Sequence, residues 1–326
     1  MKAIKFFAIS AMAAAMITSC STDDELSQSN YPSDNIIRVT AGVNNAKTRA
    51  EGAGTEMKND FSLTIVNRNA SKYTYTDKVF SKSSGDWACS ETLLWQKSDA
   101  LVDIVAFAPA QTGKFNGVYA NGSIQPIAYS VAKDQSTKSD NNDLLYYYAK
   151  DFNPGTSLVN KKLSIQFNHA FCMIDIVVTL GTEFNKPKVL DDSPIVKVTL
   201  DGTKIAANVD VKNAASVVTA SETATPTTIT TTKGTFTKAA NEEANAKSCF
   251  SCIAIPQTVA ANTFKVSLMT AGKRYEWTSD KEITLQSGYR YTLELSMGND
   301  VVLLKGGSIS ATPWTEITSD KPLETD

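Results

Sequence analysis

The sequence lacks the short fingerprints of common enzyme active sites. It has one histidine, His169, and no GxSxG, HExxH, P-loop or dinucleotide-binding pattern. His169 precedes an apolar run typical of a buried strand, so we interpret it as a hydrogen-bonded structural residue and not as a general base. The carboxylate pair Asp191-Asp192 lies in a charged stretch, where exposure to solvent explains it. The sequence therefore predicts no catalytic residue, no cofactor site and no metal site, and we expect no enzyme.

An excess of charge of either sign is also absent. The chain has 32 Lys and Arg against 34 Asp and Glu, a formal net charge of −2. This balance argues against nucleic acid or an anionic membrane surface as a partner. No apolar run of 18 or more residues follows the N-terminal region, which excludes a later membrane-spanning helix. Apolar residues make up 42% of the chain, enough for a folded globular body.

Cysteines are few after Cys20, and no zinc-binding or redox signature emerges from them. The four are Cys89, Cys172, Cys249 and Cys252. Cys249 and Cys252 have the spacing of half a zinc site, but no second CxxC exists and the segment continues as a strand. Cys172 lies in a strand-like run, which predicts a thiol in the core. Whether these four residues form disulfides stays open from the sequence.

The N-terminus has the features of an export signal. Lys2 and Lys5 precede an apolar run from Phe6 to Ile17, too short to span a bilayer. The run ends in the tetrad 17–20, Ile-Thr-Ser-Cys, which resembles a bacterial lipobox. We therefore predict a signal peptide over residues 1–19, lipid attachment at Cys20 and anchoring of the precursor to the outer membrane. The acidic stretch after Cys20 resembles the surface-export signal of lipoproteins in Gram-negative anaerobes.

A strand followed by a protease site is predicted directly after this leader. Ile37, Val39, Ala41 and Val43 alternate with polar or small residues, the pattern of a half-buried strand. A basic, Gly-containing stretch follows, in which cleavage between Arg49 and Ala50 is accessible to a trypsin-like protease. The alternative, an ordinary first strand and an ordinary loop, stays open on this stretch alone.

The rest of the chain has the pattern of strands almost throughout, with almost no helical periodicity. Strands are expected at 61–66, 101–108, 163–167, 171–180, 196–200, 264–269, 274–278 and 289–295, which are rich in Val, Ile, Thr and Tyr. Turn pairs such as Asn121-Gly122 favour antiparallel sandwiches over a parallel sheet with helices. The stretch 181–194 has two prolines and a charge cluster, and we predict a domain boundary there. The Thr-rich stretch 220–240 is predicted to be a solvated loop or an exposed hairpin.

Several motifs resemble the fimbrillin family, the type V pilins of Gram-negative anaerobes. The sequence LSIQFNHA at 163–170, followed by alternating apolar residues, is similar to that family's hallmark. Further similar motifs are LW at 94–95 leading into VDIVAFAP, DLLY at 143–146, IAIPQ at 253–257, YRY at 289–291 and the late stretch 309–314. None of these motifs is catalytic, and the resemblance covers nearly the whole chain.

The resemblance implies an all-β fold of two transthyretin-like antiparallel β-sandwich domains in tandem, at 50–182 and 183–326. It also implies a lipid-attached propeptide, 20–49, whose strand is removed by an Arg-specific protease. A terminal strand of a neighbouring fimbrial subunit then fills the groove left by Ile37, Val39, Ala41 and Val43, and residues 299–326 are the candidate donor segment. The expected location is a cell-surface fimbrium, with a host or bacterial surface ligand as a further candidate partner. A shaft, a tip and an accessory position all stay open.

A surface glycan-binding lipoprotein is the alternative function, since the same export signal and fold class serve that purpose. Such a protein would use exposed aromatic side chains. Trp95 and Trp277 lie in strand patterns typical of the core, while Trp87 follows a Ser-Ser-Gly-Asp stretch and is expected to be exposed. Trp314 is the fourth candidate.

Overall fold

A computed structural model gives the fold of the protein and describes residues 30–44, 55–57, 59–83, 85–111, 113–137, 142–304 and 309–314. Strands dominate these residues. The helical segments are short: α1 (Pro154–Ser157), η1 (Ser71–Tyr73), η2 (Asn116–Val118) and η4 (Thr182–Asn185). The predicted all-β class is confirmed. Among the residues that the structure describes, no helix has the length and apolar character needed to cross a membrane.

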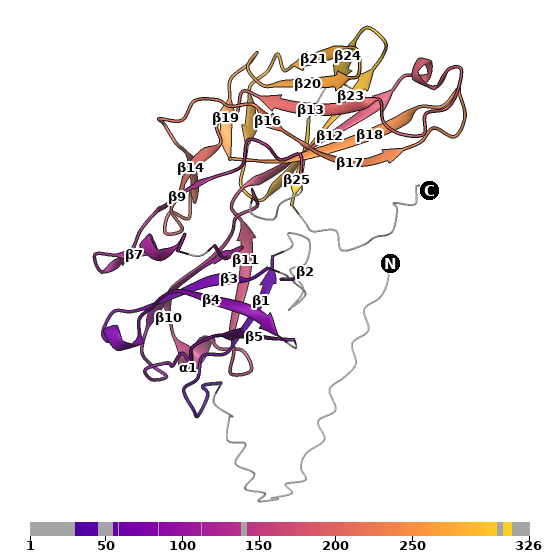
Figure 1. Ribbon diagram of the computed structural model, residues 1–326. Helices are drawn as coiled ribbons and strands as arrows, with labels where there is room; N and C mark the ends of the chain where they lie inside the picture. The colour runs from indigo at the N-terminus through magenta and orange to yellow at the C-terminus, as the bar shows by residue number, and fades with distance from the viewer. Residues whose placement is uncertain are drawn as a thin grey trace, which may run out of the picture.

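The first half of the chain forms an eight-stranded sheet, drawn indigo to magenta at the lower end of Figure 1. Its spatial order is β11 (Leu163–His169), β10 (Leu145–Phe152), β6 (Val102–Ala108), β3 (Phe61–Asn67), β4 (Tyr75–Ser83), β5 (Asp86–Cys89), β1 (Val39–Val43) and β2 (Thr55–Glu56). A further pairing joins β1 to β11, so that the sheet closes on itself. A closed sheet has no free edge along the closing strand.

The inside of this closed sheet is one apolar cluster. Alternate residues of β3 and β11 point into it, including Phe61, Leu63 and Phe167, none of which is exposed. The ring of Phe61 stacks on that of Phe80 at 5.4 Å and tilts against that of Trp87 at 4.9 Å. The period-2 alternation in the sequence thus produces a continuous core because every strand turns the same face inward.

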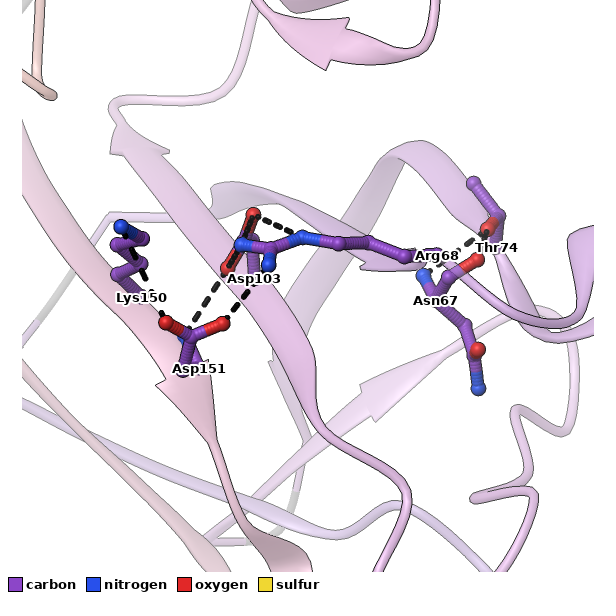
Figure 2. A network of polar contacts seen from close by, with 6 residues as sticks. All are labelled: Asn67, Arg68, Thr74, Asp103, Lys150 and Asp151. Carbon is purple, nitrogen blue, oxygen red and sulfur yellow. Dashed lines mark hydrogen bonds and ion pairs between the residues drawn. The ribbon is translucent and has the colours of Figure 1, made fainter.

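One polar network ties three neighbouring strands together on the outer side of this sheet. Figure 2 shows the guanidinium of Arg68, just after β3, between the carboxylates of Asp103 on β6 and Asp151 on β10. The nitrogen to oxygen distances are 2.6 Å to Asp103 and 2.9 Å to Asp151. The hydrogen bond to Asp103 is the main cause of a raised pKa at Arg68. The Arg68 side chain is 48% exposed, so water screens the attraction.

The second half packs two sheets face to face, drawn mainly orange to yellow at the upper end of Figure 1. The larger sheet has the order β17 (Thr232–Thr237), β18 (Ala246–Ala254), β12 (Cys172–Leu180), β23 (Tyr289–Met297) and β24 (Val302–Leu304), with β25 (Ser310–Pro313) also paired to β23. The smaller has the order β16 (Ile229–Thr230), β13 (Ile195–Asp201), β20 (Lys265–Thr270) and β21 (Arg274–Thr278). One cluster fills the space between them, with Ile176 and Leu293 from the larger sheet and Leu200 and Leu268 from the smaller, all fully buried.

One small sheet connects the two halves. In the three-stranded sheet, β9 (Ile127–Ser130) of the first half pairs with β14 (Ala206–Val209) of the second, which also pairs with β15 (Val218–Ala220). The remaining pairs are β19 (Gln257–Val259) with β22 (Ile283–Leu285), and β7 (Tyr119–Ala120) with β8 (Ser123–Ile124). A third apolar cluster at this junction includes Phe107, Phe171 and Val209. The two halves therefore share a packed interface.

The chain passes from the first sheet to the second before it reaches the predicted linker 181–194. β12 pairs with β18 and β23 of the second half along its whole length, so the change of sheet falls between His169 and Cys172. The stretch 181–194 also packs on the second half: Asn185 is fully buried, and its side-chain amide donates to the carbonyl of Ala244. The division into 50–182 and 183–326, and the assignment of each part to a transthyretin-like sandwich, stay predictions.

Each predicted strand has a counterpart in the structure, with two differences elsewhere. The sheets are mainly antiparallel, as the turn pairs indicated, but β1 runs parallel to β11 and β12 parallel to β23. The Thr-rich stretch is more ordered than a loop: Ile229 is fully buried and β17 forms an exposed edge strand on β18. The predicted turn Asn121-Gly122 joins β7 to β8, and both residues have positive φ, which glycine and asparagine tolerate best.

Candidate functional site

The strand β1 occupies a central place in the closed sheet. Its five residues pair in parallel with β11, from Val39 opposite Leu163 to Val43 opposite Phe167. Its other side pairs with β5 at Trp87 and with β2 at Thr55 and Glu56. Just outside the strand, the amide of Leu163 donates to the Arg38 carbonyl at 2.7 Å. β1 therefore joins two parts of the sheet that would otherwise be edges.

Side chains of this segment divide sharply between core and solvent. Ile37, Val39 and Val43 are 6%, 3% and 1% exposed, and Ala41 is partly buried against the same cluster. Arg38 and Thr40, at the alternating positions, are exposed. Each of the three larger aliphatic side chains therefore fills a position inside the core. The predicted groove-filling residues thus share one face, although their proposed exchange remains a proposal.

An exposed ion pair marks the outer side of the same segment. Arg38 and Asp34 are four residues apart, with a nitrogen to oxygen distance of 2.6 Å. Hydrogen bonding from Arg38 is the main cause of the low pKa of the Asp34 carboxyl, about 2. Both side chains are more than 40% exposed. The pair thus keeps charge on the side of the strand that faces water.

Aromatic residues line the position that β1 fills. Trp87 is the partner of Val39 in the β1–β5 pairing, and Phe167 is the partner of Val43 in the β1–β11 pairing. Both rings contact Phe61, with centroid distances of 4.9 Å for Trp87 and 5.5 Å for Phe167. These three residues were not predicted as part of the site. A strand pattern shows that a side chain points inward, but it does not show which strands lie beside it.

The predicted processing and lipidation residues lie outside the described residues. Cys20, Arg49 and Ala50 all fall there, as does the predicted signal peptide 1–19. In sequence, residues 45–54 connect β1 to its antiparallel neighbour β2, whose Thr55 pairs with Val43. The predicted cleavage between Arg49 and Ala50 therefore falls in the connection between two paired strands.

The C-terminal end of β1 lies close to the end of the described chain. The side-chain amide of Asn44 donates to the Asn168 side chain at 2.9 Å. The next residue, His169, stacks on Trp314 with ring centroids 3.9 Å apart and an interplanar angle of 11°. A cavity of about 240 Å³ is lined by these four residues together with Tyr146, Ser287 and Gly288. The end of β1 and the segment after β25 thus meet at one junction.

His169 has the contacts of a structural residue. Its Nδ1 lies 2.9 Å from a carboxylate oxygen of Asp143, and 4% of the residue is exposed. The ring is held between this carboxylate and the Trp314 indole. This agrees with its interpretation as a hydrogen-bonded core residue. In the described part of the chain, no group of three or more His, Cys, Asp or Glu residues could hold a metal ion.

Tryptophan burial bears on the glycan-binding alternative. The expectation that Trp87 is exposed is wrong, because it is 9% exposed and packs against Phe61. Trp95 is 2% and Trp314 7% exposed, and Trp277 is partly buried against the second core. Gly85 lies in a turn with positive φ, but β5 begins at Asp86 and places the Trp87 ring inside the closed sheet. None of the four provides the exposed aromatic surface on which this alternative depended.

The four cysteines after Cys20 are free thiols. Cys172 and Cys252 are buried on adjacent strands of the second core, as expected for Cys172. Burial raises the pKa of Cys172, and it raises the pKa of Cys252 to about 12. Cys89 and Cys249 are partly exposed. Cys249 and Cys252 are three residues apart on β18, so their side chains lie on opposite faces of the strand, which does not suit a shared ligand.

Comparison with known proteins gives the family. The fimbrillin-like family matches residues 48–314, a range that begins after β1. Among solved structures, a candidate cell adhesion protein from Bacteroides ovatus is 16% identical with a TM-score of 0.62, over 86% of this chain and 98% of that one. A fimbrial protein from Bacteroides vulgatus is 15% identical with a TM-score of 0.54, over 86% and 99%. No curated protein matches the chain.

A third similar structure is the tip fimbrial protein Mfa3 from Porphyromonas gingivalis, in a form with C-terminal truncation. It is 10% identical with a TM-score of 0.50, over 86% of this chain and 99% of that one. At such identities the likeness is one of fold. Because the family match covers most of the sequence, the chain belongs to the fimbrillin-like family.

Proposed function

We propose that the protein is a structural subunit of a cell-surface fimbria and assembles by strand exchange after a protease removes β1. The position of β1 inside a closed sheet is the observation that carries this proposal. Membership of the fimbrillin-like family supports it, since fimbriae are surface appendages built from such subunits. The fimbria would support adhesion and biofilm formation. Other fimbrial subunits and an Arg-specific protease are the proposed partners.

Removing β1 would open the sheet between β11 and β5. Both neighbours would then have unpaired backbone groups, and the positions of Ile37, Val39 and Val43 would be empty. Burying three such side chains is worth roughly 5 to 9 kcal/mol as an upper estimate. This is similar to the whole stability of many domains, so an incoming strand that fills the groove could hold a fibre together.

The uncut precursor would stay monomeric because its own strand occupies the groove. A tethered strand has an effective concentration that a free partner strand does not reach. Cleavage after Arg49 removes the tether and turns β1 into a dissociable piece. Lipid at Cys20 would hold the precursor at the outer membrane until then. The proposed order of events is therefore export, lipidation at Cys20, cleavage after Arg49 and assembly.

The test is to treat purified precursor with an Arg-specific protease while partner subunits are present. Light scattering should show growth of large species for the unaltered chain, and mass spectrometry should show a new N-terminus at Ala50. The Arg49→Ala variant should stay monomeric, whereas the matched variant Lys47→Ala should still assemble. Complete cleavage with no assembly, even with partner subunits supplied, would refute the proposed function.

Lipidation is tested separately. Cys20→Ala should give a precursor without lipid that does not reach the cell surface, because residue 20 is the proposed attachment point. A mature N-terminus at a residue other than 20, measured before Arg-specific cleavage, would contradict this part of the proposal.

A further inference from the structure

The groove that β1 fills makes strict demands on any strand that replaces it. The strand lies between neighbours on both sides, with five paired residues toward β11 and further pairs toward β5 and β2. Proline removes a backbone donor, so it is poorly tolerated in such a position. Three of four alternate inward positions, those of Ile37, Val39 and Val43, take a branched aliphatic side chain that is almost fully buried.

The candidate donor segment 299–326 does not reproduce this pattern. In every register, at most two of four alternate positions are Val, Ile or Leu. Val302 and Leu304 are followed at the next inward positions by Gly306 and Ser308. Ile309 is followed by Ala311 and then by Pro313. Each register therefore leaves a core position unfilled, or puts a polar residue or a proline into the centre of the sheet.

The apolar residues of this segment already have places in their own half. Val302 is 7% exposed, and Leu304 and Ile309 pack against the second core. Trp314 is 7% exposed, its ring stacks on His169, and its amide donates to the Gly288 carbonyl at 2.7 Å. Withdrawing the segment would expose these side chains and would break seven register pairs with β23.

The start of the segment is held as well. The Lys273 ammonium lies 2.7 Å from a carboxylate oxygen of Asp300. The hydroxyl of Tyr275 donates to the Asn299 carbonyl at 2.9 Å. Both contacts come from β21 or from the residue just before it. The segment is thus fastened at its beginning, along β23 and at Trp314.

We propose that the β1 groove takes its strand from a chain of different sequence, and not from residues 299–326 of a second copy. This inference rests on the proposed function, because it assumes that β1 leaves. The partner strand has branched aliphatic residues at the first, second and fourth of four alternate positions and a small apolar residue at the third. It has no charge on that face and no proline within the paired length. The protein is then an acceptor in mixed assemblies and does not form a homopolymer through this groove.

The experiment cleaves the purified chain after residue 49 with an excess of one synthetic peptide present, so that the groove is not left empty. One peptide spans residues 36–44 and the other residues 299–326. Native mass spectrometry identifies the bound peptide, and competition against labelled 36–44 gives the affinity ratio. Two control peptides of 36–44 have Val39→Asp on the buried face and Thr40→Asp on the exposed face.

Peptide 36–44 and its Thr40→Asp form should stay bound, and Val39→Asp should abolish binding. Peptide 299–326 should bind at least about tenfold more weakly than 36–44, since its best register leaves one branched aliphatic position unfilled and each such position costs about a tenfold loss or more. Without added peptide, the processed chain should show no growth in light scattering at rising concentration. The changes Gly306→Ala and Ser308→Val in peptide 299–326 complete its alternate apolar face and should recover binding.

Equal affinity of the two peptides, or growth of the processed chain by itself, would overturn the inference and leave the proposed function intact. A failure of peptide 36–44 to stay bound has a different meaning. It would show that the cleaved chain has no exchangeable groove, and the proposed function and this inference would then both be wrong. Recovery by the two substitutions separates a poor fit of the sequence from a general inability of the peptide to compete.

Discussion

The two ends of the described chain are built into their sheets in opposite ways. β1 lies inside a closed sheet, with β11 on one side and β5 and β2 on the other. β24 and β25, near the other end, pair with β23 alone and lie along the rim of an open sheet. A strand with neighbours on both sides is needed for the closure of its core, whereas a rim strand adds to a core that other strands already form. This difference makes β1 the more consequential strand to remove.

The largest expected effect is at the buried face of β1. Val39→Asp should lower the free energy of unfolding by more than about 4 kcal/mol, because it places an unpaired charge inside the first core. The matched change Thr40→Asp, on the exposed face, should stay within about 0.5 kcal/mol. Urea unfolding of the uncut chain measures both. Equal effects would mean that β1 is not the inner strand of a closed sheet.

A smaller effect is expected at the rim. Trp314→Ala should cost about 3 kcal/mol, since it removes the buried ring that stacks on His169. Leu303→Ala on β24, where the side chain is 59% exposed, should have almost no effect. Thermal unfolding compares the two variants. A loss at Trp314 larger than that at Val39 would reverse the comparison between the rim and the closed sheet.

The alkylation rates of the four cysteines compare buried and partly exposed thiols in the two halves without mutation. Cys172 and Cys252 should react with iodoacetamide at pH 8 at least about 100-fold more slowly than Cys89 and Cys249, because burial raises their pKa values. Peptide mapping of the alkylated sites gives the four rates. Cys89 packs partly against the first core beside β1. Its rate should rise after cleavage and loss of β1, while those of Cys172 and Cys252 should not.

Because burial raises the pKa values of the same two thiols, we expect the protein to lose stability at alkaline pH. In the unfolded chain a thiol loses its proton near pH 8.5, whereas in the fold Cys252 keeps its proton up to about 12. Stability from these groups is therefore complete below about pH 8.5 and declines as the pH rises toward the folded value. Urea midpoints between pH 7 and 11 measure this trend. Cys252→Ala should flatten it, and an unchanged slope in that variant would assign the trend to other groups.

The smallest effect is expected for the polar network on the outer side of the closed sheet. Arg68→Ala should cost less than about 1 kcal/mol, because the Arg68 side chain is half exposed, Asp151 is 44% exposed, and Asp103 keeps the hydrogen bond from the Asp151 amide (Figure 2). The loss should shrink further at high salt. Urea unfolding at two salt concentrations measures both quantities. A salt-independent cost of several kcal/mol would mean that the network, and not β1, holds this end of the sheet.

The alternation of apolar and polar residues along the sequence was sufficient to predict much of the fold. In a few places the local sequence was misleading. The alternation identified β12 and β23, because a strand with one buried face must repeat every two residues, whereas β3 and β6 are buried on both faces and were predicted from their Val, Ile and Thr content. The local sequence misplaced Trp87, because a turn-like stretch before a residue does not reveal that the next strand points its ring inward. Nor does alternation show in which sheet a strand pairs: β12, which precedes the predicted boundary in the sequence, pairs with β18 and β23 of the second half.

The sequence by itself determined the all-β class, the alternating face of Ile37, Val39, Ala41 and Val43, and the family motifs, all of which are short-range features of the chain. Only the tertiary structure decided that β1 pairs in parallel with β11, that it closes a sheet, and that Trp87 and Phe167 stand opposite its buried residues. The physical reason is that a side-chain pattern specifies which face must leave water. The partner that covers this face is chosen by long-range packing, where distant strands compete for the same backbone groups and the same core.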